Sequence, residues 1–401
     1  MTQKGRQLAA IAAAQLLAMS LWFSASAVVP QLGALWQLDA GHQAWLTMSV
    51  QLGFVAGSLL SALGNVADRM PAPWLFAASA VVGALANAAI AVVAHPQAAI
   101  AMRFLTGVAL AGVYPPGMKL AASWCREDRG FGIGLLVAAL TVGSALPHLL
   151  AALPFAGGLP PWRSVVLGAS LLALAAAVLA ARCIKQGPHA GPAAPFDARY
   201  ALRGVVERPL RLVNLGYLGH MWELYAMWTW VPVFLLGAYR QAGWSPVAGR
   251  LAGFAAIAVG AIGCLLAGSL ADRVGRGRVA IVSLAVSGSC SLVAGGFKAH
   301  PGWLTALCLV WGVAVVADSA QFSAAASELA DTRYIGTVLT VQVSLGFLLT
   351  LVSIRLLPAA ALWLGWQRVF ALLAIGPLAG IVSMRALQRL PAAARLAGGR
   401  G

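Results

Sequence analysis

Twelve apolar segments, each long enough to cross a lipid bilayer, constrain this chain more than any other feature of its sequence. A spanning helix needs about 20 residues and pairs its backbone N–H and C=O groups within itself. Hydrophobic residues make up 61% of the chain and charged residues 9%, whereas soluble domains have about 45–50% and 25%. The sequence therefore predicts an all-α membrane protein. The predicted helices cover residues 8–30, 44–63, 74–94, 97–119, 130–152, 162–182, 211–236, 247–270, 278–297, 303–327, 336–357 and 368–388.

An internal repeat divides the predicted helices into two sets of six. His95-Pro96 recurs as His300-Pro301, 205 residues later, and Gly107 recurs as Gly312 at the same offset. The segment between the sixth and seventh helices is too rich in proline and glycine for a helix interior. Two parallel copies are related by an axis along the membrane normal, and the pathway of such proteins lies between them. The predicted parts are an N-terminal half, residues 1–184, a linker, residues 185–210, and a C-terminal half, residues 211–401.

Most of the 27 lysine and arginine residues fall in loops on the side of the N-terminus. Loops rich in lysine and arginine stay in the cytoplasm, so we expect both termini to be cytoplasmic in a multi-pass protein of a bacterial-type inner membrane. This topology, together with contact with anionic lipid, explains the net charge of +16. The basic residues are scattered over short loops, which does not favour a nucleic-acid partner.

A polar, basic segment separates the eighth and ninth predicted helices at Gly268–Arg278, and a shorter copy lies at Gly64–Arg69. With twelve helices in two halves, the pattern G-x-x-x-D-R-x-G-R-x-R resembles that of the major facilitator superfamily of secondary transporters. The second copy matches fully, whereas the first departs into Met70-Pro71-Ala72-Pro73. The resemblance implies a cytoplasmic gate, which is less complete in the first half. Its residues would be Gly64, Asp68, Arg69, Gly268, Asp272, Arg273, Gly275, Arg276 and Arg278.

Arg103 begins an R-x-x-x-G pattern in the fourth predicted helix, which also resembles this family. An arginine inside an apolar segment costs about 2.5–3.5 kcal/mol on insertion scales. We therefore expect Arg103 to face a cavity and bind an anionic substrate, although its guanidinium could instead reach the nearby interface. The fifth helix lacks the antiporter signature of the family, because it continues as Ser144-Ala145-Leu146-Pro147-His148.

Two carboxyl groups lie inside predicted helices that line the cavity in the resembling family, Glu223 in the seventh and Asp318 in the tenth. Burial disfavours the ionised form of a carboxyl group, so either residue could carry a proton. His220 shares a helix face with Glu223 and is its predicted partner. The alternatives are a structural His220–Glu223 hydrogen bond and an ion pair between Asp318 and Arg355.

The predicted substrate contacts combine the arginine with aromatic and amide side chains. Trp22 is the first candidate on the first helix, where small polar residues could instead serve helix packing. Tyr114 precedes two prolines that break the fourth helix. Tyr225 belongs to an aromatic stripe, for which packing is the alternative. The full set is Arg103, Trp22, Tyr114, His220, Tyr225 and Gln321.

The sequence contains no metal-spaced cluster of His and Cys and no Walker A loop, so we expect no cofactor and no enzyme activity. The resemblance implies a secondary transporter that works by alternating access. We expect it to be monomeric and proton-coupled, and Arg103 favours a small organic anion or weak acid as the substrate. The runs after Ser144 and Asp318 are similar to the cyanate and nitrate/nitrite permease branch. Proton-driven efflux of amphipathic drug-like compounds is an alternative function, and a non-transporting receptor or scaffold is a more remote one.

Overall fold

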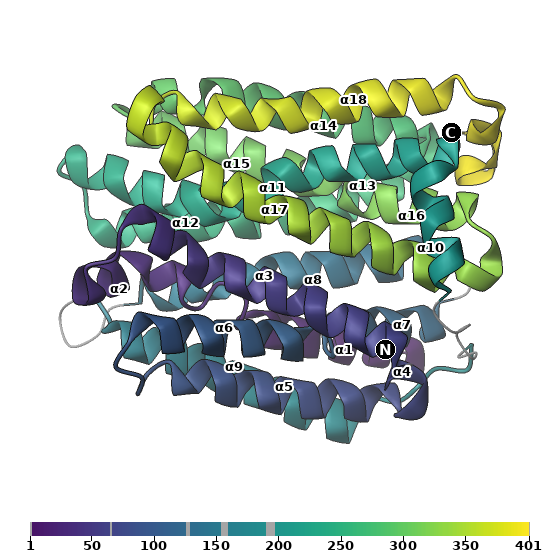
Figure 1. Ribbon diagram of the computed structural model, residues 1–401, viewed down its shortest axis with the longest axis horizontal. Coiled ribbons are helices and arrows are strands. Elements are labelled where there is room, and N and C mark those ends of the chain that lie inside the picture. The colour runs from purple at the N-terminus through teal and green to yellow at the C-terminus, as the bar shows by residue number, and fades with distance from the viewer. Residues whose placement is uncertain (1, 65, 126–128, 154–158, 190–196, 401) are drawn as a thin grey trace.

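The computed structural model describes residues 2–64, 66–125, 129–153, 159–189 and 197–400. Within these ranges the side chains at positions 67, 68, 129, 130, 198, 199, 272 and 332 lie outside the description. Long helices run side by side and form two bundles, with α1–α9 in the lower part of Figure 1 and α11–α18 in the upper part. Both chain ends lie toward the right-hand side of that view, at what we call the basic end of the bundle.

The helices of the first bundle follow the predicted order. They are α1 (Gln3–Met19), η1 (Ser26–Val28), α2 (Val29–Trp36), α3 (Ala40–Leu63), α4 (Val66–Arg69), α5 (Ala72–Ala89), α6 (Pro96–Leu110), α7 (Tyr114–Trp124), α8 (Arg129–Leu150) and α9 (Trp162–Cys183). A short helix, α10 (Ala198–Val206), precedes the second bundle. The second bundle holds α11 (Arg208–Gln241), α12 (Pro246–Ala258), α13 (Gly260–Val274), α14 (Arg276–Val293), η2 (Ala294–Phe297), α15 (Pro301–Ala317), α16 (Ser319–Leu329), η3 (Thr332–Tyr334), α17 (Ile335–Leu364), η4 (Val369–Ala374), α18 (Ile375–Gln388) and η5 (Pro391–Gly398).

Ten helical spans in the described part of the chain are long and apolar enough to cross a membrane. They coincide with ten of the twelve predicted segments. The other two are the first segment, which is interrupted after α1, and the seventh, which forms the 34-residue helix α11. The predicted fold class, an all-α membrane protein with two sets of six spanning segments, is confirmed.

The first, fourth, eighth and tenth spanning segments are interrupted near their middle, the eighth between α12 and α13. The first stops at Met19 and resumes at Ser26. The fourth is interrupted between Leu110 and Tyr114, where the prolines of α7 have no N–H to continue the helical hydrogen bonds. In the tenth, α15 and α16 meet at Asp318. These interruptions place polar backbone and one carboxyl group deep inside the bundles.

Both bundles contain the same close contact between neighbouring helices. A Cβ atom on Gly107 of α6 would lie 2.0 Å from the carbonyl oxygen of Val50 in α3. A Cβ atom on Gly312 of α15 would lie 1.9 Å from the carbonyl oxygen of Ala256 in α12. Because any side chain would collide with the opposing backbone, glycine is needed at both repeat positions.

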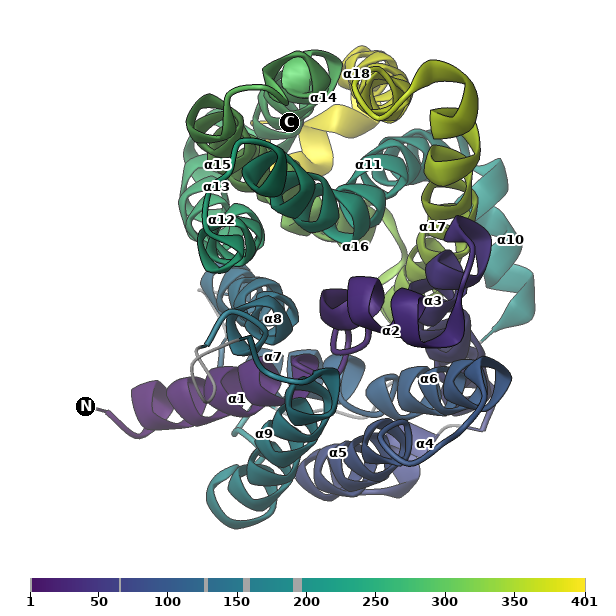
Figure 2. The ribbon, with the colours of Figure 1, turned by 90° about the vertical axis from the view of Figure 1, so that its left-hand side faces the viewer.

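The two bundles meet along two seams. One seam joins α3 to α17, and the other joins α8 to α12 and α13. Figure 2, viewed along the helices, shows these pairs on opposite sides of the boundary between the bundles. Side chains from the interrupted first segment lie between the seams and contact the second bundle.

Candidate functional site

Four aromatic rings from four spanning segments meet where the bundles face each other. The ring of Trp22 lies 5.1 Å from Phe54 of α3, 5.8 Å from Tyr225 of α11 and 5.2 Å from Phe347 of α17. Phe347 also lies 4.9 Å from Phe54 and 5.0 Å from Tyr225, measured between ring centroids. All four side chains are buried. We call Trp22, Phe54, Tyr225 and Phe347 the interface aromatic cluster; it joins two predicted substrate residues to two that the sequence did not single out.

Polar atoms without protein partners border this cluster. The indole nitrogen of Trp22 is buried and has no hydrogen-bond partner among the described residues. The same holds for both amide atoms of Gln51, one helical turn before Phe54 on α3, and for the indole nitrogen of Trp228, whose ring is 5.4 Å from Tyr225. Buried polar groups are nearly always hydrogen-bonded. Buried polar atoms among aromatic rings are the usual composition of a small-molecule site.

Asp318 and His220 form a buried pair at the interruption of the tenth segment. Oδ1 of Asp318 lies 2.8 Å from Nδ1 of His220, and each side chain is 1% exposed. The short Nδ1–Oδ1 contact lacks the angles of a hydrogen bond, and Nε2 has no hydrogen-bond partner in the described chain. The imidazole also contacts the rings of Tyr217 and Phe322. The alternative pairing of Asp318 with Arg355 is wrong, because the guanidinium of Arg355 lies against Gly41 of α3 instead.

Glu223 has a different environment from the one that the helix periodicity predicted. Its Oε2 accepts a hydrogen bond of 2.8 Å from the hydroxyl of Ser287, and its Oε1 accepts one of 2.8 Å from the indole N–H of Trp311. The predicted pairing of Glu223 with His220 is therefore wrong. His220 and Glu223 point in different directions from α11. Glu223 contacts α14 and α15, whereas His220 contacts Asp318 at the α15–α16 junction.

Arg103 is completely buried and binds the interrupted first segment. Its Nη1 donates to the carbonyl oxygen of Leu21 at 2.7 Å and to the hydroxyl of Ser24 at 3.0 Å, and its Nη2 donates to the carbonyl oxygen of Trp22. Its Nε donates to the carbonyl oxygen of Leu46 in α3 at 3.0 Å. The interfacial alternative for Arg103 is thus wrong. Its contact with an anionic substrate stays a prediction.

Gln321 lies one turn beyond Asp318 on α16, but its amide oxygen points to a different partner. It accepts a hydrogen bond of 3.2 Å from Nη1 of Arg276. Tyr114 begins α7 at the interruption of the fourth segment and packs against the hydrophobic core. The six predicted substrate residues are therefore spread over several environments, and only Trp22 and Tyr225 belong to one cluster.

The gate residues of the second repeat lie at the basic end. Gly275 has a φ of 99°, a conformation that favours glycine, and α14 begins at the next residue, Arg276. Nη2 of Arg276 lies 2.7 Å from Oε1 of Glu328 at the end of α16. Glu328 also accepts from the C-terminal segment, through its carbonyl from Arg395 at 3.1 Å and through Oε2 from the backbone N–H of Ala397 at 3.0 Å.

The structure describes only some of the other predicted gate residues. Arg69, Arg273 and Arg278 are exposed, and Gly64 and Gly268 are half-buried. The side chains of Asp68 and Asp272 lie outside the described residues. Their gate role stays a prediction.

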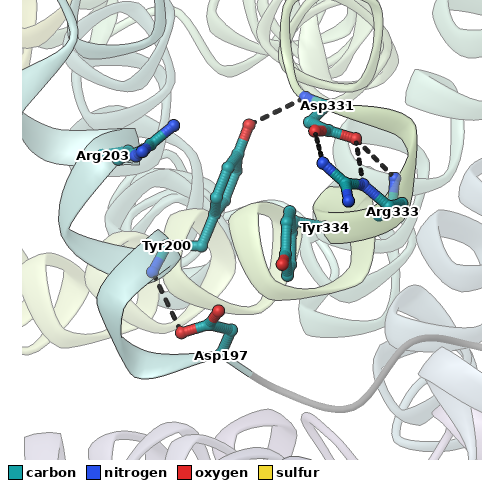
Figure 3. Close-up of a pocket in the computed structure, with 6 residues that line it drawn as sticks. All are labelled: Asp197, Tyr200, Arg203, Asp331, Arg333 and Tyr334. Carbon is teal, nitrogen blue, oxygen red and sulfur yellow. Dashed lines mark hydrogen bonds and ion pairs between the residues drawn. The ribbon is translucent and has the colours of Figure 1, made fainter.

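A cavity of about 260 Å³ lies elsewhere, at the basic end (Figure 3). The rings of Tyr200 and Tyr334 stack at 4.2 Å, and the Tyr200 hydroxyl accepts from the backbone N–H of Asp331 at 2.9 Å. Hydrogen bonds from Arg333 lower the pKa of the Asp331 carboxyl below its usual value. The cavity is lined by Asp197, Tyr200, Arg203, Asp331, Arg333 and Tyr334. None of these belongs to the interface aromatic cluster or to the His220–Asp318 pair.

Known proteins resemble the chain in sequence and in fold. A family model described as Major Facilitator Superfamily matches residues 11–354. The chain is 27% identical over 320 residues to a gallate transporter of Pseudomonas putida, covering 72% of this chain and 69% of that protein. It is 30% identical over 136 residues to the niacin transporter NiaP of Acinetobacter baylyi, covering 31% of this chain and 30% of that protein.

Two solved structures share the fold at low sequence identity. The xylose transporter XylE from E. coli, in a partially occluded inward-open conformation, has a TM-score of 0.73 at 13% identity, covering 97% of this chain and 100% of that one. A D-xylose-proton symporter has a TM-score of 0.76 at 14% identity, covering 98% of this chain and 99% of that one. At these identities the likeness concerns the fold alone.

Proposed function

The chain belongs to the major facilitator superfamily of membrane transporters, and from this premise we propose that it carries a small aromatic carboxylate across the membrane together with protons. It is a multi-pass membrane transporter and not an enzyme. In the proposed mechanism the two bundles rock about the interface aromatic cluster and expose it to each side in turn. The basic end, with both termini, is proposed to face the cytoplasm.

The observation that carries the substrate proposal is the interface aromatic cluster with its bordering polar atoms. Rings of Trp22, Tyr225 and Phe347 offer stacking and edge contacts to an aromatic ligand. The indole N–H of Trp22 and the amide of Gln51 would bind its carboxylate or hydroxyl groups. The transport substrates named for the two relatives, gallate and niacin, are both aromatic carboxylic acids, which supports this class.

A conservative change at Trp22 tests the site. We expect Trp22→Phe, which keeps an aromatic ring and removes the N–H, to raise the KM for gallate or nicotinate uptake into proteoliposomes by about 3–10-fold, the value of one hydrogen bond. Trp303→Phe is the matched control, because Trp303 is 70% exposed on α15. An unchanged KM in Trp22→Phe, or uptake of xylose in preference to both acids, would contradict the proposed substrate class.

Proton coupling is proposed for the His220–Asp318 pair. The two groups lie 2.8 Å apart inside the protein, where neutralising one partner leaves the other charge uncompensated. A proton taken up by Asp318 would therefore weaken the contact between α11 and the α15–α16 junction and shift the balance between conformations. Glu223 is the second candidate. Its two hydrogen-bond donors, Ser287 and Trp311, tie it to α14 and α15 within the same bundle.

The coupling assignment is tested by comparing two isosteric variants. We expect Asp318→Asn to lose substrate-driven proton flux in proteoliposomes while it still exchanges labelled substrate across the membrane. Glu223→Gln should keep its proton flux, because an amide can preserve contacts with both a hydroxyl and an indole N–H. Proton flux that persists in Asp318→Asn but vanishes in Glu223→Gln would transfer the role to Glu223. Substrate that moves against the direction of proton entry would favour efflux over uptake.

A further inference from the structure

The short helix α10 lies across the spanning helices instead of along them. In Figure 1 it runs across the direction of the long helices, near the end of the bundle where the C-terminus lies. In Figure 2 it occupies the outer rim, beside α17. The spanning helices follow the membrane normal, so α10 runs roughly parallel to the membrane plane at the level where α11 and α17 begin.

One face of α10 is fixed to the protein. The Tyr200 ring is buried and stacks on Tyr334, which ends η3 (Figure 3). The carbonyl oxygen of Gly204 accepts a hydrogen bond of 2.7 Å from the amide of Asn214 in α11. These contacts, on two different turns, hold the helix and set which side faces outward.

The outward side is apolar. Leu202, Val205 and Val206 are 66%, 44% and 68% exposed. Their spacing of three and four residues places them in one stripe on the helix surface. In water, this exposed apolar surface would contribute nothing to stability, because the protein covers it only in part. A membrane would cover these side chains, as it would the exposed apolar side chains of the spanning helices.

Basic side chains flank this stripe. Arg203 on α10 and Arg208 and Arg211 on the first turn of α11 are exposed. Arg203 lies over the ring of Tyr200 and has a loose contact with Glu207, 3.9 Å between Nη1 and Oε1, so its guanidinium stays accessible. An apolar stripe with arginines beside it is the composition of helices that lie in the headgroup region of anionic membranes.

From this arrangement we propose that α10 is an interfacial anchor, which inserts Leu202, Val205 and Val206 among the acyl chains and binds anionic phospholipid headgroups through Arg203, Arg208 and Arg211. The occupant is the lipid surface and not a second protein, because α10 runs roughly parallel to the membrane plane and exposed arginines flank its apolar stripe. The anchor would fix the linker between the two bundles to the membrane while the bundles move. It depends on the membrane embedding of the chain and not on the identity of the substrate.

Spin labels on neighbouring residues test the insertion directly. The full chain first receives Cys183→Ala, which removes the exposed cysteine. Either Val206→Cys or Glu207→Cys is then added and spin-labelled, and the protein is reconstituted in vesicles of phosphatidylcholine mixed with phosphatidylglycerol. We expect the label at 206 to collide more with oxygen, which concentrates in lipid, than with a water-soluble nickel chelate. The label at 207 should show the reverse order. Equal nickel access at both positions would overturn the anchor.

The headgroup part has its own control. In vesicles of phosphatidylcholine alone, and in the triple variant Arg203→Gln, Arg208→Gln, Arg211→Gln with phosphatidylglycerol present, we expect the label at 206 to become more accessible to the nickel chelate. Accessibility that is the same in both lipids and in the triple variant would overturn the assignment of the arginines to anionic headgroups. Transport of gallate does not enter either measurement, so its failure and the failure of the anchor are distinguishable.

Discussion

Replacing Arg103 with alanine separates a structural role of this residue from a role in substrate binding. The guanidinium donates to the carbonyl oxygens of Leu21 and Trp22, where the first segment has left the helical conformation, and to that of Leu46 in α3. Alanine would remove these donors from a site that water does not reach, since Arg103 is 0% exposed. We therefore expect Arg103→Ala to release the interrupted turn from α6 and α3.

The cost follows from the number and kind of bonds lost. Each buried carbonyl left without a donor costs about 1–3 kcal/mol. Leu21 has other local donors, Ser24 among them, so the carbonyls of Trp22 and Leu46 account for most of the cost, about 2–6 kcal/mol in total. A unit of about 200 residues loses about 2–4 °C of Tm per kcal/mol, which predicts a drop of about 4–24 °C.

The assay is thermal unfolding of the purified protein in detergent, with the folded fraction at each temperature measured by size-exclusion chromatography. Arg163→Ala is the matched control, because Arg163 is exposed and donates to one backbone carbonyl, that of Ala91 at 2.9 Å. Its Tm should change by no more than the equivalent of about 1 kcal/mol. Arg103→Lys should fall between the two, since an ammonium group keeps the charge but cannot reproduce the planar fork of a guanidinium.

One result would refute this reasoning. If Arg103→Ala unfolds at the same temperature as Arg163→Ala but no longer takes up gallate or nicotinate, the guanidinium is a substrate ligand and the carbonyl contacts are incidental. A lower Tm with an unchanged KM in the surviving protein would instead establish that Arg103 stabilises the interrupted first segment without binding substrate.

Two further predictions concern helix packing and the basic end. Gly107→Ala should lower the free energy of unfolding by about 1–3 kcal/mol or more, because the new methyl group collides with the Val50 carbonyl. The control is Gly237→Ala, whose Cβ would have no neighbour within 4 Å and which should be neutral or stabilising in the same unfolding assay. Glu328→Gln should weaken the contact with Arg276, 2.7 Å away, and increase the reactivity of a cysteine at Arg395→Cys toward a water-soluble thiol reagent; unchanged labelling would show that Glu328 does not hold the C-terminal segment.

The sequence was sufficient to predict the architecture, because each spanning helix is defined by its own residues and depends little on contacts with distant parts of the chain. Each spanning segment must satisfy its backbone within the lipid, so its length and composition are visible in a window of about 20 residues. The repeat anchor Gly107 and Gly312 was also readable, and the structure supplies its physical cause, since both glycines let two helix backbones touch. Tyr114 with its two prolines marked the interruption of the fourth segment in the same local way.

The candidate site was predicted less completely because its contacts join residues far apart in the chain. Helix periodicity placed His220 beside Glu223, but which acid the imidazole meets depends on the packing of α14, α15 and α16 around α11. The interruption after Met19 contains no proline or glycine before Ser26. The local sequence therefore did not predict that carbonyl groups would be free there to bind Arg103. In the sequence, Phe54 and Phe347 were indistinguishable from other apolar residues, because only the packing of α3 and α17 around the interrupted first segment places them beside Trp22.

The sequence by itself determined that this chain spans a membrane in two repeated sets of helices and carries a few ionisable side chains inside them. Only the tertiary structure decided the partners of these side chains: Arg103 with the carbonyls of the interrupted first segment, Asp318 with His220, and Glu223 with a serine and a tryptophan. The physical reason is that hydrophobic burial is non-directional and follows composition, whereas a buried polar group must find a partner at hydrogen-bond distance and angle. That partner is set by the packing of helices that the chain order alone does not place.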